Sequence, residues 1–376
     1  MREFPIFHRR TVRSEQEAAV HAFWSHRTSV IVLKSGLLML VPLSAHLPPG
    51  ALARMSPSRF LRKFLGRYLR MNIWIWKHLP AFSVSWRPVR RYGCHLQSLI
   101  QLQPWATRSQ SVGTFFFRNR PELELLIRLL DQKLQNSTVK VAVLACSKGA
   151  EVYSISYAIR CARTDLKVRL CALDISKDIL EFAEAGLYSL SHDGSGAPSR
   201  SLALAGDVAT STSRDQPSSL FERMSSGEMK AMFDREGDQV RVKPRFQEGI
   251  SWHLGDAGDP RLIDALGFQD IVVANRFLCH MYPKQAEECL RNIARLVNPS
   301  GYLFVSGVDL SVRSKVAREL GWRPVMELIR EIHEGDPSLR RDWPLQYWGL
   351  EPFDQRRKDW KMRYSSVFQL GRAPEG

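Results

Sequence analysis

The chain has 376 residues, of which 44% are hydrophobic and 24% charged, so it is long and apolar enough for one large or two ordinary globular domains. This composition excludes a largely disordered or fibrous chain. The formal net charge of +16 is concentrated near the N-terminus, because residues 1–110 hold 17 Lys and Arg against 3 Asp and Glu. A segment this basic predicts an acidic partner: a protein surface, nucleic acid or anionic lipid.

The cysteines and the hydropathy predict a cytoplasmic protein. The six cysteines are scattered and form no CxxC pair, which is typical of buried free thiols in a reducing compartment. The apolar stretch Val30–Leu47 is short for a membrane span and is interrupted by Lys34 and Pro42, so we expect no stable membrane insertion. It also starts too far along the chain for an ordinary signal peptide. No His, Cys, Asp or Glu cluster has the spacing of a metal site, and we expect no metal.

Residues 1–110 are predicted to form a basic, mostly helical domain with a linker. The pattern of Ser56–Asn72 is that of an amphipathic helix, with apolar residues on one face. An acidic protein segment is the partner predicted for its other face. A merely solvated face and a nucleic-acid partner, which is less favoured because no nucleic-acid module is visible, remain alternatives. The basic side chains of that face are Arg59, Lys63, Arg67 and Arg70.

From residue 111 to 376 the pattern changes to alternating strands and helices, which predicts an α/β fold with a doubly wound, mainly parallel sheet. A stretch near 191–219 rich in Ser, Gly, Ala and Asp is predicted to be a flexible insertion. Residues 221–252 suggest a helix followed by a small inserted β subdomain, and Tyr364–Leu370 a final strand. The predicted strands are 139–146, 168–173, 270–274 and 302–307, and the predicted helices are 121–135, 151–163, 177–186 and 283–297.

The first strand, the loop after it and the next strand predict a nucleotide or cofactor site. The buried strand from Val139 ends in the small-residue loop CSKGA, where the backbone of Ser147 and Gly149 is open to a ligand, and a helix follows. The second strand ends in Asp174, placed to accept hydrogen bonds from ribose hydroxyls. The loop is neither GxGxxG nor a P-loop, which weakens a dinucleotide or phosphate ligand and favours S-adenosylmethionine. An ordinary strand–helix–strand unit is the alternative.

Three further polar residues follow predicted strands or open a helix. Asp256 comes after a strand and could accept a hydrogen bond from an adenine amino group, although a turn is the commoner role for Asp before Gly. Asn275 ends the strand DIVVAN and could serve a ligand or the structure equally well. Glu151 opens the helix after the loop, where a carboxylate also suits the helix dipole.

The order of these motifs resembles the CheR-type chemotaxis receptor methyltransferases over roughly residues 111–310. The family's Thr-x-Phe-Phe-Arg entry is similar to Thr114-Phe-Phe-Phe-Arg118, and CSKGAEVYS is similar to its small-residue loop and Glu. Asp256–Ala257 matches the Asn-Leu adenine contact, and Val273-Ala274-Asn275 the Cys-Arg-Asn strand end. The sequence departs from the family at Val112, at Ala150, at Ala274 and in the segment RFLCHMY after Asn275. The resemblance implies the Rossmann-like fold of class I methyltransferases and S-adenosylmethionine as cofactor.

The resemblance also implies a role for each matched residue. Thr114 and Arg118 would contact the methionine part of the cofactor or flank the reacting methyl group, and Glu151 would lie by the methionine amino group. Asp174 would hold the ribose, Asp256 with Ala257 the adenine, and Asn275 would line the site near the sulfonium. Arg118 would also act as the catalytic residue that positions the acceptor. The full predicted cofactor set is Thr114, Arg118, Ser147, Gly149, Glu151, Asp174, Asp256, Ala257 and Asn275.

The implied reaction is the transfer of a methyl group to a glutamate carboxylate of a protein, as in chemotaxis receptors. A carboxylate with a reference pKa of about 4.3 is already ionised near neutral pH, so no general base is required. Two other functions remain open: a methyltransferase for a small molecule, and a non-catalytic regulatory or nucleic-acid-binding relative.

Overall fold

The computed structural model describes residues 59–101, 113–190, 220–336, 339–340 and 343–371. The predicted insertion near 191–219 and the apolar stretch Val30–Leu47 lie outside the described residues. The contacts divide the chain into two units. The smaller unit comprises residues up to 107 together with 341–351, and the larger unit comprises 108–340 and 352–376.

The smaller unit is helical in its described part. It contains α2 (Arg59–Lys77), the short helix η3 (Ala81–Ser85) and α3 (Arg87–Gln101). The helix predicted over 56–72 is therefore present and runs five residues further, while its first three residues lie outside the described part. Asn72 of α2 and Tyr92 of α3 tie the two helices together, because the tyrosine hydroxyl donates to Asn72 Oδ1 at 2.9 Å.

A segment from the far end of the sequence completes the smaller unit. Trp343 packs edge-on against Trp76 of α2 with ring centroids 5.4 Å apart, and its Nε1 donates to Gln97 Oε1 at 3.0 Å. Gly93 of α3 faces the indole so closely that a Cβ there would overlap the ring. The sequence predicts a single second domain over residues 111–376. The structure corrects it, because residues 341–351 belong with the N-terminal helices.

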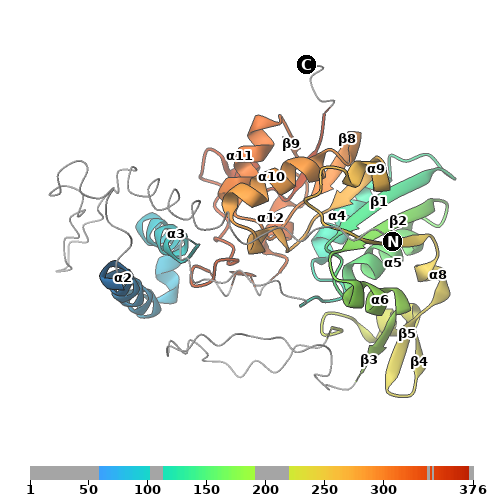
Figure 1. Ribbon diagram of the computed structural model, residues 1–376, viewed down its shortest axis with the longest axis horizontal. Coiled ribbons are helices and arrows are strands. Elements are labelled where there is room, and N and C mark those ends of the chain that lie inside the picture. Colours follow the sequence, from blue (N-terminus) through green and yellow to red (C-terminus); the bar gives the residue numbers. More distant parts are fainter. Residues whose placement is uncertain (1–58, 102–112, 191–219, 337–338, 341–342, 372–376) are drawn as a thin grey trace. The chain divides into compact units, whose positions relative to one another are not determined.

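The larger unit is built on a seven-stranded sheet in the order β6-β2-β1-β7-β8-β10-β9 (Figure 1). The strands β6, β2, β1, β7 and β8 are parallel to one another, whereas β10 runs antiparallel to β8 and β9. The predicted doubly wound, mainly parallel sheet is confirmed. The strands are β1 (Thr138–Leu144), β2 (Lys167–Asp174), β6 (Ile250–Leu254), β7 (Gln269–Val273), β8 (Val297–Phe304), β9 (Arg323–Pro324) and β10 (Val367–Gln369).

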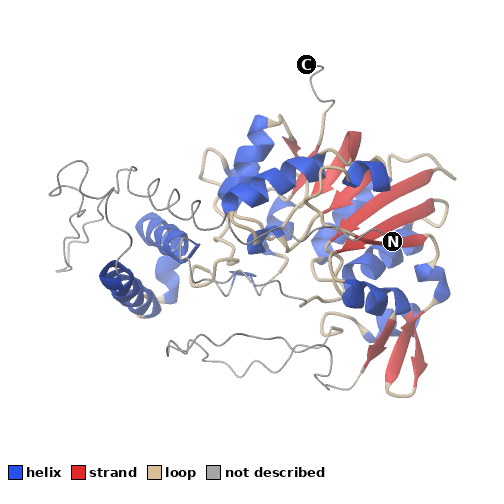
Figure 2. Ribbon diagram, viewed as in Figure 1, coloured by secondary structure: helices blue, strands red, loops and turns tan. Residues whose placement is uncertain are grey.

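Both faces of this sheet are covered by helices (Figure 2). Side chains of β1 alternate between the faces, as the pleat requires: Val141 and Val143 pack with α4 and α5, whereas Ala142 and Leu144 pack with α10 and α11. This is why the strand sequence is apolar throughout rather than alternating. The α-helices of the unit are α4 (Arg120–Leu130), α5 (Ala150–Ala162), α6 (Lys177–Ala185), α7 (Ser226–Met232), α8 (Pro244–Gln247), α9 (Leu262–Leu266), α10 (Pro283–Ala294), α11 (Leu310–Glu319), α12 (Ile329–Glu334) and α14 (Trp360–Tyr364), with the short η4 (Leu278–His280).

The predicted β subdomain is present as a three-stranded antiparallel sheet, β3 (Leu187–Ser189), β5 (Gln239–Val242) and β4 (Phe233–Glu236). It lies apart from the larger sheet in Figure 1. An aromatic cluster that includes Phe116, Tyr153, Tyr188 and Phe233 joins it to α5. Tyr188 also donates its hydroxyl hydrogen to Lys148 O at 2.6 Å, so the small sheet supports the loop that follows β1.

Within the described residues, no helix combines the length and the apolar character that a membrane crossing requires. The same residues contain no group of three or more His, Cys, Asp or Glu side chains arranged to hold a metal ion.

Candidate functional site

The predicted cofactor residues follow strands that end at one edge of the larger sheet. Leu144 at the end of β1 is level with Leu173 of β2, and Val143 is level with Val273 of β7. The loop after β1, Asp174 and Asn275 therefore lie at the same carboxyl edge. The order of the strands also reverses between β1 and β7, since β2 and β6 extend the sheet in one direction and β7 and β8 in the other. Ligands of open α/β sheets bind at this kind of reversal.

The loop after β1 has an unusual backbone. Ala145, Ser147 and Gly149 all have positive φ, at 53°, 50° and 79°. Such conformations cost free energy for residues other than glycine, and they gather at ligand sites. At Gly149, the N-cap of α5, a Cβ would lie 3.1 Å from the Cβ of Ala183 and 3.2 Å from Tyr153 Cε2. Both the dihedral angle and the packing therefore require glycine here.

Asp174, the last residue of β2, holds this loop. Its Oδ2 accepts a hydrogen bond from the backbone N–H of Ser147 at 2.8 Å, and its Oδ1 accepts one from Ser176 N at 3.0 Å. The side chain is buried, with 8% of its surface exposed. Each carboxylate oxygen has a second lone pair, so the fixed carboxylate can still accept hydrogen bonds from two ribose hydroxyls.

Asp256 and Ala257 follow β6 beside this region, since Gly255 N donates to Asp174 O at 3.0 Å. Asp256 is exposed, and its Oδ1 accepts from Gly258 N at 2.8 Å. The turn role that the sequence also allowed is therefore present. Ala257 is buried in the core between the sheet and α10. The adenine contact of these two residues stays a prediction.

A second group of predicted residues lies between α4, α5 and β7. Asn275 Nδ2 donates to Glu151 Oε1 at 2.8 Å and to Glu122 Oε1 at 2.5 Å. Asn275 Oδ1 accepts from both the backbone N–H and the hydroxyl of Ser306, at 2.9 and 2.7 Å. Because a backbone N–H can only donate, the amide oxygen must face Ser306 and the NH₂ group must face the carboxyls.

Burial dominates the electrostatics of the two carboxyls. It raises the pKa of Glu122 to about 7, and the neighbouring Glu151 raises it further. Burial also raises the pKa of Glu151 above its ordinary value, against the opposing effects of Asn275, Arg118 and Arg276. The pair is therefore a site where protonation changes near neutral pH.

Three arginines gather beside this pair around one aspartate. Arg276 Nη2 and Arg223 Nη2 lie 2.8 and 3.1 Å from the two oxygens of Asp336, which is buried. Arg223 Nη1 donates to Arg118 O at 2.6 Å, and the guanidiniums of Arg223 and Arg118 lie 4.7 and 5.4 Å from the ring centroid of Phe115. Burial and the like charge of Arg276 lower the pKa of Arg118 to about 10.

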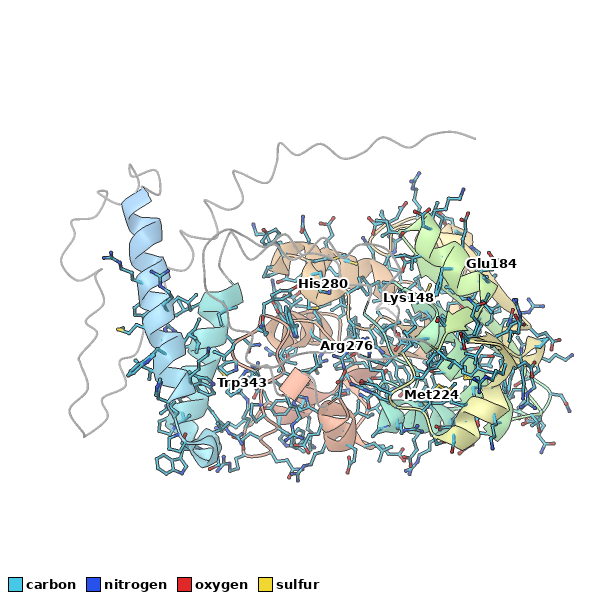
Figure 3. The ribbon with its side chains drawn as sticks, turned by 90° about the horizontal axis from the view of Figure 1, so that it is seen from below. Lys148, Glu184, Met224, Arg276, His280 and Trp343 are labelled. Carbon is cyan, nitrogen blue, oxygen red and sulfur yellow. The ribbon has the colours of Figure 1, made fainter. Side chains whose placement is uncertain are left out.

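A cavity of about 20 Å³, enough for roughly one water molecule, is lined by side chains of both groups. Its polar lining includes Arg118, Glu122, Glu151, Asn275 and Arg276. Among the described residues, none accepts a hydrogen bond from the buried Nε atoms of Arg118 and Arg276. In Figure 3 the labels Arg276, which follows β7, and Lys148, in the loop after β1, mark two of the loops at the carboxyl edge of the sheet. The Nη2 atoms of these arginines donate to Gly113 O and to Asp336, so one Nε–H of each remains for a ligand. Two such donors beside two carboxyls match a ligand that carries both an anionic and a cationic group, such as an amino acid end.

The structure thus arranges the predicted residues in two groups joined by α5. Arg118, Glu151 and Asn275 line the cavity, while Ser147, Gly149 and Asp174 form the loop site at the other side of the first turn of α5. Thr114 is half-buried and does not line the cavity.

Sequence reasoning missed Glu122, Arg223, Arg276, Ser306 and Asp336. One signal was available. The family has Arg directly before the Asn at the end of this strand, and here the guanidinium comes from the next residue, Arg276. The others join the site only through tertiary contacts.

Comparison with known proteins identifies the fold's family. Residues 113–194 match the family model of the CheR methyltransferase SAM binding domain, and residues 224–305 match a general methyltransferase domain model. These matches confirm the predicted resemblance of the larger unit to a divergent CheR-type methyltransferase. S-adenosylmethionine, predicted from the loop and Asp174, is therefore confirmed as its cofactor. The loop after β1 and the strand-end carboxylate suit its ribose, and the charges that line the cavity complement those of its amino acid end.

Two curated relatives match about three fifths of this chain. The probable biofilm formation methyltransferase WspC of Pseudomonas aeruginosa is 26% identical over 232 residues, which cover 60% of this chain and 48% of the relative. The protein of the same name from Pseudomonas putida is 24% identical over 240 residues, covering 62% of this chain and 49% of the relative. The chain thus spans about half the length of the curated relatives it matches.

Among solved structures, magnesium protoporphyrin IX methyltransferase from Synechocystis PCC 6803 with bound SAM aligns over 55% of this chain and 70% of its own, with 13% identity and a TM-score of 0.30. The fold assignment rests on the strand order of the chain itself and not on that similarity.

Proposed function

We propose that the protein transfers the methyl group of S-adenosylmethionine to a glutamate carboxylate of a protein, as chemotaxis-receptor methyltransferases do. The observation that carries this proposal is a pair of half-buried arginines, Arg118 and Arg276. Their buried Nε atoms have no hydrogen-bond acceptor among the described residues, and both side chains line the cavity that Glu151 and Asn275 also line. Two cations at one site suit two anions: the carboxylate of the cofactor and the carboxylate of the acceptor.

The reaction needs orientation more than proton transfer. S-adenosylmethionine, held by the loop after β1 and Asp174, would supply a methyl group that leaves its sulfonium sulfur as a carboxylate oxygen bonds to the methyl carbon, with S-adenosylhomocysteine as the leaving group. An acceptor glutamate with a pKa of about 4.3 is ionised at neutral pH, so no base has to remove a proton. Arg118 positions the acceptor carboxylate through its buried Nε, which has no acceptor among the described residues. Correct orientation alone can lower a barrier by about 7–11 kcal/mol.

The arginines of the smaller unit support the protein nature of the acceptor. On the described part of α2, the exposed side chains are Arg67, Arg70, Met71, Trp74 and Lys77, and none of them is acidic. Such a face complements an acidic helical segment. Of the four basic residues predicted to bind the partner, Arg67 and Arg70 are thus exposed, while the side chains of Arg59 and Lys63 lie outside the described part.

The experiment is methyl transfer from S-adenosylmethionine with a labelled methyl group to synthetic helical peptides that carry several glutamates. We expect incorporation of label that mild alkali releases as methanol, because a methyl ester hydrolyses whereas N-methyl and C-methyl groups do not. The same peptide with Gln at each glutamate should stay unlabelled. Arg118→Lys should retain cofactor affinity but lose most of the turnover, since a lysine cannot reproduce the planar guanidinium.

Alkali-stable label, or label in the Gln peptide, would overturn a carboxylate acceptor. Labelling of small carboxylic acids but of none of the peptides would replace the protein acceptor with a small molecule.

A further inference from the structure

Glu122 is a buried carboxyl that the proposed methyl transfer does not use. It lies in the first turn of α4, as Glu151 lies in the first turn of α5, and each carboxylate faces the positive end of its own helix. Their Oε1 atoms both accept a hydrogen bond from the same nitrogen, Asn275 Nδ2. Two carboxyls that share one donor group are too close for both to be ionised at low energetic cost.

Asn275 fixes this arrangement because all its hydrogen-bonding groups are engaged. Its oxygen accepts from Ser306, and its two N–H groups go to Glu122 and Glu151, so neither hydrogen is left for a ligand. Asn275 therefore holds Glu151 and Glu122 in place, while the position near the sulfonium that the resemblance implies for Asn275 stays a prediction.

The other charged groups around the pair do not neutralise it directly. Arg118 and Arg276 face it from the loop before α4 and from the loop after β7, and Arg313 faces Glu122 from α11. Within the described part of the chain, no guanidinium donates a hydrogen bond to either carboxyl. Asp336 is shared by Arg276 and Arg223 on the far side of the arginines. One proton retained by the two carboxyls would remove the charge repulsion between them.

We propose that Glu122 is a positioning residue of the cofactor site: it shares a proton with Glu151 across Asn275, and this proton leaves when the ammonium group of the cofactor binds at Glu151. The inference rests on the proposed function only for the cofactor, and it adds a residue and a proton that the resemblance does not imply. The balance is simple, because the protein loses H⁺ to the buffer as the cationic ammonium takes its place, and no covalent bond of the ligand changes.

The test is titration calorimetry of the full chain with S-adenosylhomocysteine, in phosphate and in Tris buffer. The two buffers differ in their enthalpy of protonation, so the difference in binding heat gives the number of protons released. Near pH 7 we expect release of about half a proton, because Glu122 titrates there. Affinity should rise about tenfold from pH 5.5 to pH 7, a range in which the amino group of the ligand stays protonated.

Glu122→Gln should bind without proton release and with an affinity that does not change over this pH range, since the carboxamide oxygen still accepts from Asn275. The matched control is Glu124→Gln on the same helix, an exposed residue whose partner is Arg128, and it should behave as the unmodified protein does. A residue with a merely structural role would shift the affinity without altering its pH profile.

Binding of normal strength with no proton release in the unmodified protein would overturn this inference and leave the proposed function intact. Absence of binding at every pH would instead overturn the cofactor site and the proposed function. If Glu122→Gln does not fold, infrared difference spectroscopy of the unmodified protein decides: the C=O band of a protonated carboxyl should disappear on addition of S-adenosylhomocysteine, and its persistence would contradict the proposal.

Discussion

Ser147 donates its backbone N–H to Asp174 Oδ2 at 2.8 Å, which ties the loop after β1 to the carboxylate at the end of β2. Ser147 has a φ of 50°, in the left-handed region that non-glycine residues seldom adopt. The hydrogen bond thus helps to hold a strained backbone in place. Asp174 consequently has two tasks, since it shapes the loop and faces the expected ribose.

This double role makes Asp174→Ala a severe change. The variant loses the acceptor for the ribose hydroxyls and the acceptor for Ser147 N, and hydrogen bonds to charged groups contribute about 1.5–3 kcal/mol each. We expect the affinity for S-adenosylhomocysteine, measured by calorimetry, to fall by about 100-fold or more. Asp178→Ala, at an exposed position in the first turn of α6, is the control and should leave the affinity unchanged. Equal affinities of the two variants would rule out the ribose assignment.

Gly149→Ala should destabilise the fold through two additive effects. A non-glycine residue at a φ of +79° costs about 1–2 kcal/mol, and the new Cβ would also crowd Ala183 and Tyr153. Gly237→Ala isolates the first effect, because Gly237 has a φ of +63° with nothing within 4 Å of the added Cβ. In urea unfolding, Gly149→Ala should therefore lose more stability than Gly237→Ala, and only Gly149→Ala should weaken cofactor binding. A smaller loss at Gly149 would mean that the loop relaxes without strain.

The sequence predicted the loop half of the site and missed much of the cavity half, for a physical reason. Strand, loop, helix and strand are consecutive, so Asp174 could be placed from local pattern alone. Glu122 instead looked like an ordinary acidic residue in a first helical turn, and its contact with Asn275 spans 153 positions. The segment around Trp343 was misplaced in the same way, because only tertiary packing joins it to Gln97.

Removal of the Glu122 charge should change how stability depends on pH. In the folded protein burial raises the pKa of Glu122 from an ordinary value of 4.5 to about 7, so between these two pH values the folded state binds the proton more tightly than the unfolded state does. The free energy of unfolding must then fall as pH rises from about 4.5 to 7, by an amount on the order of 3 kcal/mol.

Glu122→Gln cannot ionise and should lack this decline, so it should be more stable than the unmodified protein at pH 8 in chemical unfolding. Glu124→Gln serves again as the exposed control. If Glu122→Gln and the unmodified protein lose stability in parallel over this range, Glu122 is ionised in the folded state.

The exposed arginines of α2 should govern the affinity for an acidic acceptor segment. Ion pairs at exposed positions contribute about 0.2–1 kcal/mol each. Reversing the charge of both Arg67 and Arg70 to Glu should therefore lower the affinity for a glutamate-rich helical peptide by about tenfold. The same exposure implies that salt should weaken the complex. Fluorescence anisotropy of the labelled peptide measures both effects, while calorimetry with S-adenosylhomocysteine should show unchanged cofactor binding.

The control is the double reversal of Lys284 and Arg318, which are exposed on the larger unit. Equal weakening by both double variants would mean that the peptide senses only net charge, and a stronger, salt-steep affinity for RNA than for the peptide would identify nucleic acid as the partner of α2.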